Sequence, residues 1–334
     1  MMFKIAINGF GRIGRHAFAV AHARSDMEIV AINDLADNTS LAHLLQYDTA
    51  YPERGLAVQA TEKGLIIDGK EIPVFSQKNP AELPWGELHV DVVLECTGVF
   101  RTKEGAQLHR DAGAKKVIIS APAKEENVPT YVRGINCANY AGEAIINNAS
   151  CTTNCTAPVM QVLEKNFGIE HALLTTIHSY TADQNLQDGP HKDLRRARAA
   201  AQNIVPTSTG AAIATAQVIP SLSGSFDGLA VRVPTITGSL SDINVLLKKE
   251  TNKEELNEVF KEAEAGAFAG VLATTDKPLV STDFIGNPHS SIVDLDLTMV
   301  VGGRLVKIIA WYDNEWGYAN RLVEMAQIVA SFEA

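Results

Sequence analysis

Short apolar runs alternate with helical stretches through the first half of the chain. The strand-like runs cover residues 3–8, 28–33, 91–96 and 116–120. Helical stretches follow the first and the third of these runs, and such an order is typical of βαβ units. Two more short runs in residues 65–75 flank Asp68-Gly69, a pair typical of a hairpin turn. This half therefore predicts an α/β fold, a doubly wound parallel sheet with an added hairpin.

The second half of the chain has a different pattern. Residues 171–180 and 229–247 alternate between apolar and polar positions, and such alternation predicts half-buried strands. Thr251 followed by Glu254 predicts a capping box that opens a helix, and residues 316–332 form an amphipathic helical stretch. We therefore expect an α+β second domain whose sheet is mostly antiparallel. The pattern alone does not assign the final helix to either domain.

The length of the chain agrees with two domains. A chain of 334 residues exceeds the ~250 to 300 residues at which a single core usually stops growing. We place the first domain at residues 1–150 and the second at residues 151–313, where the pattern changes.

Charge, apolar content and cysteine spacing exclude several classes of protein. The formal net charge is −10, and an acidic surface repels nucleic acids and anionic membranes. No apolar run reaches the ~20 residues of a membrane-spanning helix, and residues 1–8 lack the features of a signal peptide. Cys96, Cys137, Cys151 and Cys155 fit neither a disulfide scaffold nor a paired zinc-site spacing. We expect a protein of the reducing cytoplasm that binds no metal, nucleic acid or membrane.

A glycine-rich loop follows the first predicted strand. Gly9, Gly11 and Gly14 have the GxGxxG spacing and stand between a strand and a helix, as in a Rossmann-type dinucleotide-binding turn. The first glycine allows the tight turn, the second lets the pyrophosphate approach, and the third lets helix and strand pack closely. Asp34 follows the second strand, where a carboxylate binds the ribose hydroxyls of NAD and repels the 2′-phosphate of NADP. These coinciding features favour an NAD site over an ordinary turn with a solvated acid.

Cys151 has two features of a nucleophile. It opens a predicted helix after a strand-like run at residues 144–148, and the helix N-terminus is expected to lower the thiol pKa. A helix over residues 152–167 advances ~24 Å, and an extended return from Glu170 to His178 covers ~30 Å. The matched lengths bring His178 back beside Cys151 as a candidate base. From spacing alone, an inert buried cysteine is an equal alternative.

Several motifs in order along the chain closely resemble the glyceraldehyde-3-phosphate dehydrogenase family, and the resemblance covers essentially the whole chain. The motifs are Asn8-Gly-Phe-Gly-Arg-Ile-Gly-Arg15, Ala149-Ser-Cys-Thr-Thr-Asn-Cys-Thr-Ala-Pro158, His178-Ser-Tyr-Thr181, Asp193-Leu-Arg-Arg-Ala-Arg198, Pro206-Thr-Ser-Thr-Gly-Ala-Ala212, Arg232-Val-Pro-Thr235 and Trp311-Tyr-Asp-Asn-Glu-Trp-Gly-Tyr318.

The resemblance implies a reaction and its catalytic residues. D-Glyceraldehyde 3-phosphate, inorganic phosphate and NAD would give 1,3-bisphosphoglycerate and NADH. Cys151 would attack the aldehyde, hydride would leave the hemithioacetal for the nicotinamide, and phosphate would attack the resulting thioester. His178 would move the protons and, with the Cys151 backbone amide, stabilise the oxyanion.

The resemblance also implies three sets of ligand-binding residues. The phosphate of the substrate would be held by Thr181, Arg196 and Arg232. Inorganic phosphate would be held by Ser150, Thr152, Thr209 and Gly210. Besides the three glycines, the cofactor would be held by Arg12 and Ile13 at the pyrophosphate, Asp34 at the adenosine ribose, Lys78 and Ser120 nearby, and Asn314 at the nicotinamide amide.

Two statements on organisation follow from the same resemblance. Asn314 and the terminal helix, about residues 314–334, would join the first, NAD-binding domain, while residues 151–313 form the catalytic domain. Residues 181–203 would form a loop packed between the subunits of a homotetramer.

Three alternative hypotheses compete with an NAD-dependent enzyme of the glyceraldehyde type. Erythrose-4-phosphate dehydrogenase shares the cysteine and histidine motifs but departs after the histidine and around the Thr-Gly phosphate segment, where this sequence follows the glyceraldehyde type. An NADP-preferring biosynthetic relative is disfavoured by Asp34-Leu35, although Gly189-Pro190 leaves some ambiguity. A binding protein that has lost catalysis is disfavoured by the joint presence of Cys151, His178 and the phosphate residues.

Overall fold

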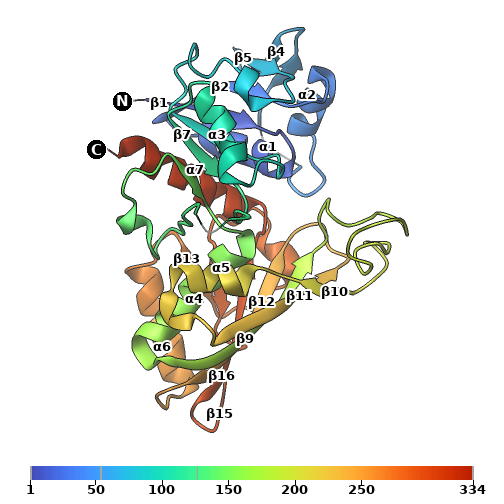
Figure 1. The fold of residues 1–334 in the computed structure, drawn as a ribbon. Helices are drawn as coiled ribbons and strands as arrows, with labels where there is room; N and C mark the ends of the chain where they lie inside the picture. The colour runs from blue at the N-terminus through green and yellow to red at the C-terminus, as the bar shows by residue number, and fades with distance from the viewer. Residues whose placement is uncertain (1, 53–54, 126, 333–334) are drawn as a thin grey trace. The chain divides into compact units, whose positions relative to one another are not determined.

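The computed structural model of the protein describes residues 2–52, 55–125 and 127–332. Its contacts divide the chain into two compact units. Figure 1 colours the chain by residue number, from blue at the N-terminus to red at the C-terminus. Unit 1 comprises Met1–Tyr131, Asn136–Ala149 and Ala319–Ala334, and unit 2 comprises Val132–Ile135 and Ser150–Tyr318. None of the helices within the described residues is long and apolar enough to cross a membrane.

Unit 1 is built on a sheet with the strand order β3-β4-β5-β2-β1-β6-β7-β8. The strands are β1 (Phe3–Asn8), β2 (Met27–Asn33), β3 (Val58–Ala60), β4 (Gly64–Ile67), β5 (Lys70–Phe75), β6 (Val92–Glu95), β7 (Lys116–Ile119) and β8 (Ile145–Asn147). The helices are α1 (Arg12–His22), α2 (Asn38–Gln46), α3 (Lys103–Asp111) and the greater part of α7 (Trp316–Ser331), with short 3-10 helices at Pro80–Glu82 and Cys137–Asn139. All strands from β5 to β8 in this order pair in parallel, which confirms the predicted doubly wound sheet.

Both faces of this sheet are covered, because neighbouring strand residues point to opposite sides. Ile5 and Ile7 of β1 pack in a core with side chains of α1, α2 and α7. Ala6, between them, packs in a second core with Trp85 and with Ala106 of α3. The strand order reverses beside β1, so the carboxyl ends of β1 and β6 form the crevice where such sheets bind ligands.

The predicted hairpin is the β4–β5 pair. Asp68 and Gly69 form its two-residue turn, and both have positive φ, 49° and 83°. Two consecutive positive φ values give the turn type whose twist matches that of the flanking strands, and Asp-Gly tolerates them.

Unit 2 is built on a second sheet with the strand order β10-β11-β9-β12-β16-β14-β13, and β15 pairs with β16. The strands are β9 (Ile169–Ser179), β10 (Val205–Ser208), β11 (Phe226–Val233), β12 (Ser239–Leu247), β13 (Leu272–Thr275), β14 (Ser291–Asp294), β15 (Met299–Val301) and β16 (Leu305–Tyr312). The helices are α4 (Cys151–Phe167), α5 (Ala211–Val218) and α6 (Lys253–Ala265), with 3-10 helices at Pro220–Leu222 and Ser281–Phe284.

The second sheet is mostly antiparallel, as predicted. Parallel pairing occurs between β9 and β11 and between β13 and β14, and the other pairs are antiparallel. Helix α4 packs against α5, α6 and the strands β9, β12, β14 and β16. On β9 the buried residues alternate, with Ala172, Leu174, Thr176 and His178 buried. Leu173 lies on the opposite face and is exposed.

The alternating stretch at residues 229–247 contains the end of β11 and all of β12, separated by a turn at Gly238, whose φ is 88°. One local prediction in unit 2 is wrong in detail. The cap of α6 is Asn252, whose side chain accepts a hydrogen bond from the Glu255 amide at 2.9 Å. Thr251 precedes this cap because its own amide donates to the Gly303 carbonyl, and asparagine caps at least as well as threonine.

Candidate active site

Cys151 is the first residue of α4. The side chain of Ser150 caps this helix by accepting a hydrogen bond from the Thr153 amide at 3.1 Å. The preceding residue, Ala149, is buried and has a φ of 53°, an unusual value for a residue with a side chain. A sharp turn therefore places the thiol at the N-terminus of a buried helix.

His178 lies beside Cys151, as the matched lengths of α4 and β9 predicted. Its Nε2 is 3.4 Å from Cys151 Sγ, and its Nδ1 is 2.7 Å from the carbonyl oxygen of Ser179. The imidazole is 4% exposed, near the end of β9. Because the even-numbered residues of β9 face the helices, the register of this strand decides that His178 points toward α4.

Arg232 is brought to the same place by sheet pairing. Strands β11 and β9 run in parallel, and Arg232 is the direct partner of His178 in their register. One guanidinium nitrogen, NH1, lies 2.9 Å from His178 Nδ1, 3.1 Å from the Ser179 carbonyl oxygen and 3.4 Å from Thr181 Oγ1. Arg232 and Thr181, both predicted to hold the substrate phosphate, therefore lie together next to His178.

Tyr312 is a member of this cluster that the sequence analysis missed. Its hydroxyl lies 3.0 Å from Thr152 Oγ1 and 2.8 Å from Thr176 Oγ1, and its ring is 6.0 Å from the His178 ring. Inward alternation along β16 is the signal that could have found it. The same contact directs the buried Thr152 hydroxyl toward β16, so the structure does not place it as an open ligand for phosphate.

Burial dominates the electrostatics of the Cys151 and His178 pair. The expectation of a lowered thiol pKa is wrong for this structure, because burial raises the pKa of Cys151 more than the charge of Arg232 lowers it. Burial and the same charge lower the pKa of His178 to about 3. The pair at neutral pH is therefore a thiol beside a neutral imidazole. Cys155 is fully buried, and burial raises its pKa to about 12.

The other predicted phosphate residues differ in how they are engaged. The Arg196 guanidinium binds Asp183, donates to Thr207 Oγ1 at 2.9 Å and donates to the Ser208 carbonyl at 3.3 Å. Burial lowers the pKa of Arg232, and the charge of Arg196 adds to this effect. Thr209 and Gly210 stand at the start of α5, where Gly210 is the N-cap and Thr209 Oγ1 accepts from the Ala211 amide.

The glycine loop of unit 1 has the shape that a dinucleotide site needs. Gly9 has a φ of 90°, and a Cβ there would lie 2.7 Å from the Thr97 amide nitrogen. A Cβ at Gly14 would overlap the carbonyl oxygen of Gly9. A Cβ at Gly11 would meet no protein atom within 4 Å. Gly9 and Gly14 are therefore required by the fold, whereas the space beside Gly11 is open to a ligand.

Asp34 follows β2 and lies at this loop. Its carboxylate accepts hydrogen bonds from the Phe10 amide at 2.6 Å and the Ala36 amide at 3.0 Å. Arg12 and Ile13 are the first two residues of α1, so their backbone belongs to a helix N-terminus. The Arg12 side chain forms an ion pair with Asp48 at 2.9 Å, which directs the guanidinium to that carboxylate.

The three remaining predicted cofactor residues lie apart in the chain. Lys78 is exposed in the segment after β5. Ser120 follows β7, its amide donates to the Glu95 carbonyl, and its hydroxyl contacts the Cys96 thiol. Asn314 belongs to unit 2 and is buried, and its amide oxygen accepts from the hydroxyls of Ser239 at 2.8 Å and Thr237 at 3.3 Å.

A buried polar network supports the glycine loop and was also missed. Glu95 and His109 are fully buried, and His109 Nε2 lies 3.0 Å from Glu95 Oε2. Trp85 donates its indole N–H to His109 Nδ1 at 3.0 Å. The Glu95 carboxylate also accepts from the Asn8 side chain and from the Thr97 amide. The network thereby links the carboxyl ends of β1 and β6 beside the crevice.

Comparison with known proteins identifies the family. The family model described as the glyceraldehyde 3-phosphate dehydrogenase NAD binding domain matches residues 3–103, and the one described as the C-terminal domain matches residues 150–314. A glyceraldehyde-3-phosphate dehydrogenase of Thermotoga maritima is 56% identical over 331 residues, covering 98% of this chain and 99% of that protein. The chain belongs to the glyceraldehyde 3-phosphate dehydrogenase family.

Other proteins named glyceraldehyde-3-phosphate dehydrogenase are similar to this chain over its whole length. The glyceraldehyde-3-phosphate dehydrogenase of Streptomyces coelicolor is 53% identical and that of Geobacillus stearothermophilus is 50% identical, each over 99% of both chains. The predicted family, fold class and class of enzyme are confirmed. Of the sites described above, the glycine loop and Asp34 lie in the matched NAD binding domain, and Cys151, His178 and Arg232 lie in the matched C-terminal domain.

Proposed function

We propose that this chain oxidises D-glyceraldehyde 3-phosphate with NAD and inorganic phosphate to 1,3-bisphosphoglycerate, through a thioester on Cys151. The observation that carries this proposal is the 3.4 Å separation of Cys151 Sγ and His178 Nε2 at the N-terminus of α4. A thiol beside a neutral imidazole is an activated nucleophile. Membership of the dehydrogenase family supports the substrate and the reaction.

The side chains then have distinct tasks. Cys151 Sγ bonds to the aldehyde carbon while His178 Nε2 takes the thiol proton. The Cys151 amide and the protonated imidazole stabilise the oxyanion that forms. His178 gives its proton to this oxygen, and it takes the proton back as the hemithioacetal is oxidised. Phosphate attack on the thioester carbon then releases Sγ.

The glycine loop of unit 1 fits the cofactor, which supplies the hydride acceptor when bound. Gly11 offers the open space for a pyrophosphate, beside the backbone of Arg12 and Ile13 at the start of α1. Asp34 offers a carboxylate to the adenosine ribose. The oxygen of Asn314 is fixed by two hydroxyls, so its amide nitrogen is the proposed donor to the nicotinamide amide. Lys78 and Ser120 complete the proposed set.

The phosphate groups are assigned to two sites. Thr181 and Arg232, which contact each other, are proposed to hold the phosphate of the substrate, together with Arg196. Ser150, Thr152, Thr209 and Gly210 are proposed to hold inorganic phosphate. The N-terminus of α5, whose N-cap residue Gly210 has no side chain to cap it, gives this second site its strongest support. The Thr152 hydroxyl already contacts Tyr312 and gives the weakest.

The experiment is a comparison of substrates. NADH formation is measured with glyceraldehyde 3-phosphate and with erythrose 4-phosphate, each with and without inorganic phosphate. We expect phosphate-dependent turnover that prefers glyceraldehyde 3-phosphate. A higher kcat/KM for erythrose 4-phosphate would assign the chain to the related activity, and turnover independent of phosphate would exclude the phosphorolysis step.

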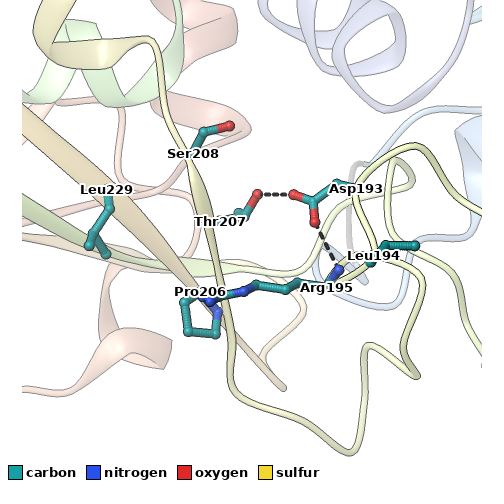
Figure 2. A pocket seen from close by; sticks show the side chains of 7 residues that line it. All are labelled: Asp193, Leu194, Arg195, Pro206, Thr207, Ser208 and Leu229. Atoms are coloured by element: carbon teal, nitrogen blue, oxygen red, sulfur yellow. Dashed lines mark hydrogen bonds between the residues drawn. The ribbon is translucent and has the colours of Figure 1, made fainter.

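We also propose that the chain forms a homotetramer in which residues 181–203 lie between subunits. Leu186 and Leu194 in this segment are 77% and 80% exposed, and Ile204 after it is 71% exposed. Leu194 borders a hollow of about 490 Å³ (Figure 2). The hollow is lined by Asp193, Leu194, Arg195, Pro206, Thr207, Ser208 and Leu229, so it does not include the catalytic pair. Exposed leucines around a hollow favour contact with another protein surface.

A charged substitution on this surface is a test of the proposed homotetramer. The mass of the wild type and of Leu194→Asp is measured by light scattering after size exclusion, with Lys261→Asp on the exposed side of α6 as the control. We expect only Leu194→Asp to lower the mass. A wild type that elutes as a monomer contradicts the assembly. Location in the cytoplasm stays a prediction from the sequence.

A further inference from the structure

The two contacts of His178 Nδ1 compete with each other. The Ser179 carbonyl oxygen, 2.7 Å away, can only accept a hydrogen bond, and the Arg232 guanidinium, 2.9 Å away, can only donate one. A neutral imidazole carries one proton, so Nδ1 is either a donor or an acceptor. One of these two contacts is therefore a hydrogen bond at any time, and the other is not.

Whether Nδ1 carries the ring proton determines whether Nε2 faces Cys151 Sγ, 3.4 Å away, with a lone pair or with a proton. When Nδ1 accepts from Arg232, the ring proton sits on Nε2, which then donates toward the sulfur and cannot take a proton from it. When Nδ1 donates to Ser179, Nε2 has a lone pair and can act as the base. The tautomer of the His178 ring therefore determines whether His178 can act as the base.

We propose that Arg232 sets the tautomer of His178, and that the phosphate of the substrate reverses it by binding Arg232. This inference rests on the proposed function, in which Arg232 holds that phosphate. Without an anion, the guanidinium faces the lone pair of Nδ1, because a buried cation is stabilised by an acceptor and not by another N–H. Arg232 Nε is also buried and has no hydrogen-bond partner among the described residues, so a second N–H of this guanidinium lacks an acceptor.

A phosphate dianion favours the other tautomer of His178, because its charged oxygens accept hydrogen bonds from the guanidinium in place of Nδ1. NH1 then leaves Nδ1, and Nδ1 takes up a proton and donates to Ser179. The Nε2 proton passes to water while a proton from water arrives at Nδ1, so the charge of the ring is unchanged. The lone pair of Nε2 now faces the thiol. Arg232 is in this respect a positioning residue, and the base becomes competent once the phosphate is in place.

The kinetic test uses a substrate without its phosphate. The burst of NADH is measured at saturating D-glyceraldehyde, with and without sodium phosphite as a free dianion. We expect saturating phosphite to raise the burst rate constant by about 10²-fold, the lower end of the range for a positioned base. We expect Arg232→Leu to show no response and Arg304→Leu, an equal change at a solvent-accessible ion pair with Glu170, to respond like the wild type.

Two results would overturn the inference. One is a saturated burst rate of the wild type that phosphite leaves unchanged, and the other is a response that persists in Arg232→Leu. The wild type with glyceraldehyde 3-phosphate is the reference. If this reference shows no burst, the proposed function itself fails, which is a different outcome from a normal reference burst without phosphite activation.

A spectroscopic test reads the tautomer directly. Enzyme with ¹⁵N-labelled histidine is studied by solid-state NMR, and the His178 signals are assigned as those absent in His178→Asn. We expect an unprotonated Nδ1 without an anion and a protonated Nδ1 with phosphite, whereas a purely structural role of Arg232 would leave both signals in place. A protonated Nδ1 in both states would show that Arg232 does not set the tautomer.

Discussion

The glycine loop of unit 1 and the thiol site of unit 2 are built in different ways. The loop uses consecutive residues from Gly9 to Gly14 and offers backbone atoms and empty space. The thiol site takes side chains from the ends of α4, β9 and β11, which are far apart in sequence. Cys151, His178 and Arg232 meet only because helix length and strand register bring them together.

This difference determines what a substitution does at each site. A change in the loop acts through steric fit, because few of its side chains take part. A substitution of a reacting residue in the thiol site is expected to change the reaction rate and not the backbone, since the residues that hold the backbone are separate from those that react. A register shift by one residue on β9 would turn His178 to the opposite face of the sheet.

The largest effect is expected from Cys151→Ser. We expect the NADH burst to fall by roughly 10⁴-fold or more, on the scale seen when a nucleophile is removed from other enzymes. In the wild type, iodoacetamide should label Cys151 before Cys155, because Cys155 is fully buried and Cys151 is partly exposed. Peptide mapping by mass spectrometry checks this order, and earlier labelling of Cys155 would reverse the assignment.

The next effect is that of His178→Asn. We expect turnover to fall by roughly 10²- to 10⁴-fold, the range for loss of a positioned base. The dissociation constant for NAD should stay the same, because the glycine loop belongs to the other unit. Stopped-flow bursts and equilibrium fluorescence titration measure the two quantities. Unchanged turnover would require a different base.

A third comparison separates the two phosphate sites. Arg232→Ala should raise the KM for glyceraldehyde 3-phosphate by about one to two decades, because a charge-assisted hydrogen bond contributes ~1.5 to 3 kcal/mol. Thr209→Ala should instead raise the KM for inorganic phosphate and leave the NADH burst in place. Initial rates with each substrate varied give both constants. Equal increases of both KM values in both variants would contradict the assignment.

The glycine loop offers a matched pair of variants. Gly14→Ala forces the Cβ against the Gly9 carbonyl, so we expect a loss of ~1 to 3 kcal/mol in stability together with weaker NAD binding. Gly11→Ala meets no protein atom and should keep the melting temperature while losing NAD affinity. Thermal unfolding and NAD titration separate the two cases. A destabilised Gly11→Ala would show that the space there belongs to the fold and not to a ligand.

The smallest effect is expected at Asp34. We expect Asp34→Ala to narrow the preference for NAD over NADP by about five- to tenfold, because a solvated charge pair interacts by only ~1 kcal/mol. Activity should persist, since the pyrophosphate contacts remain. Ratios of kcat/KM for the two cofactors measure this, with Asp111→Ala at the exposed end of α3 as the control. Full discrimination in the variant would rule out Asp34 as the selector.

The features that could be predicted from sequence are those encoded by nearby residues. The parallel sheet and the hairpin at Asp68-Gly69 follow from short periodic runs and a turn pair. The approach of His178 to Cys151 follows from two lengths that match. The cap at Asn252 was missed by one residue, because Thr251 and Asn252 are both good caps and the sheet decides between them.

The features that could not be predicted depend on tertiary contacts. Tyr312 reaches Thr152 from β16, 160 residues further along the chain, so the inward alternation of β16 indicates that Tyr312 is buried but not which residue it contacts. The pKa of Cys151 is raised because burial of the thiol outweighs the charge of Arg232 and the hydrogen bonds of Thr152 and Cys151, and burial depends on tertiary packing. The buried pair of Glu95 and His109 joins a strand end to a helix of the same unit, and both residues look like ordinary surface groups in sequence.

Helix α7 has a consequence for the order in which the protein is made. Its residues from 319 onward, among them Leu322, Met325 and Val329, complete the core of a unit whose strands end at β8. Roughly 170 residues separate β8 from α7, and at ~5 to 20 residues per second a ribosome needs about 10 to 30 s to make them. The part of this core that α7 covers stays exposed throughout that time, although α1 and α2 are already made. The unit that is synthesised first is therefore the last to be finished, and the nascent chain presents an apolar surface to chaperones until translation is nearly over.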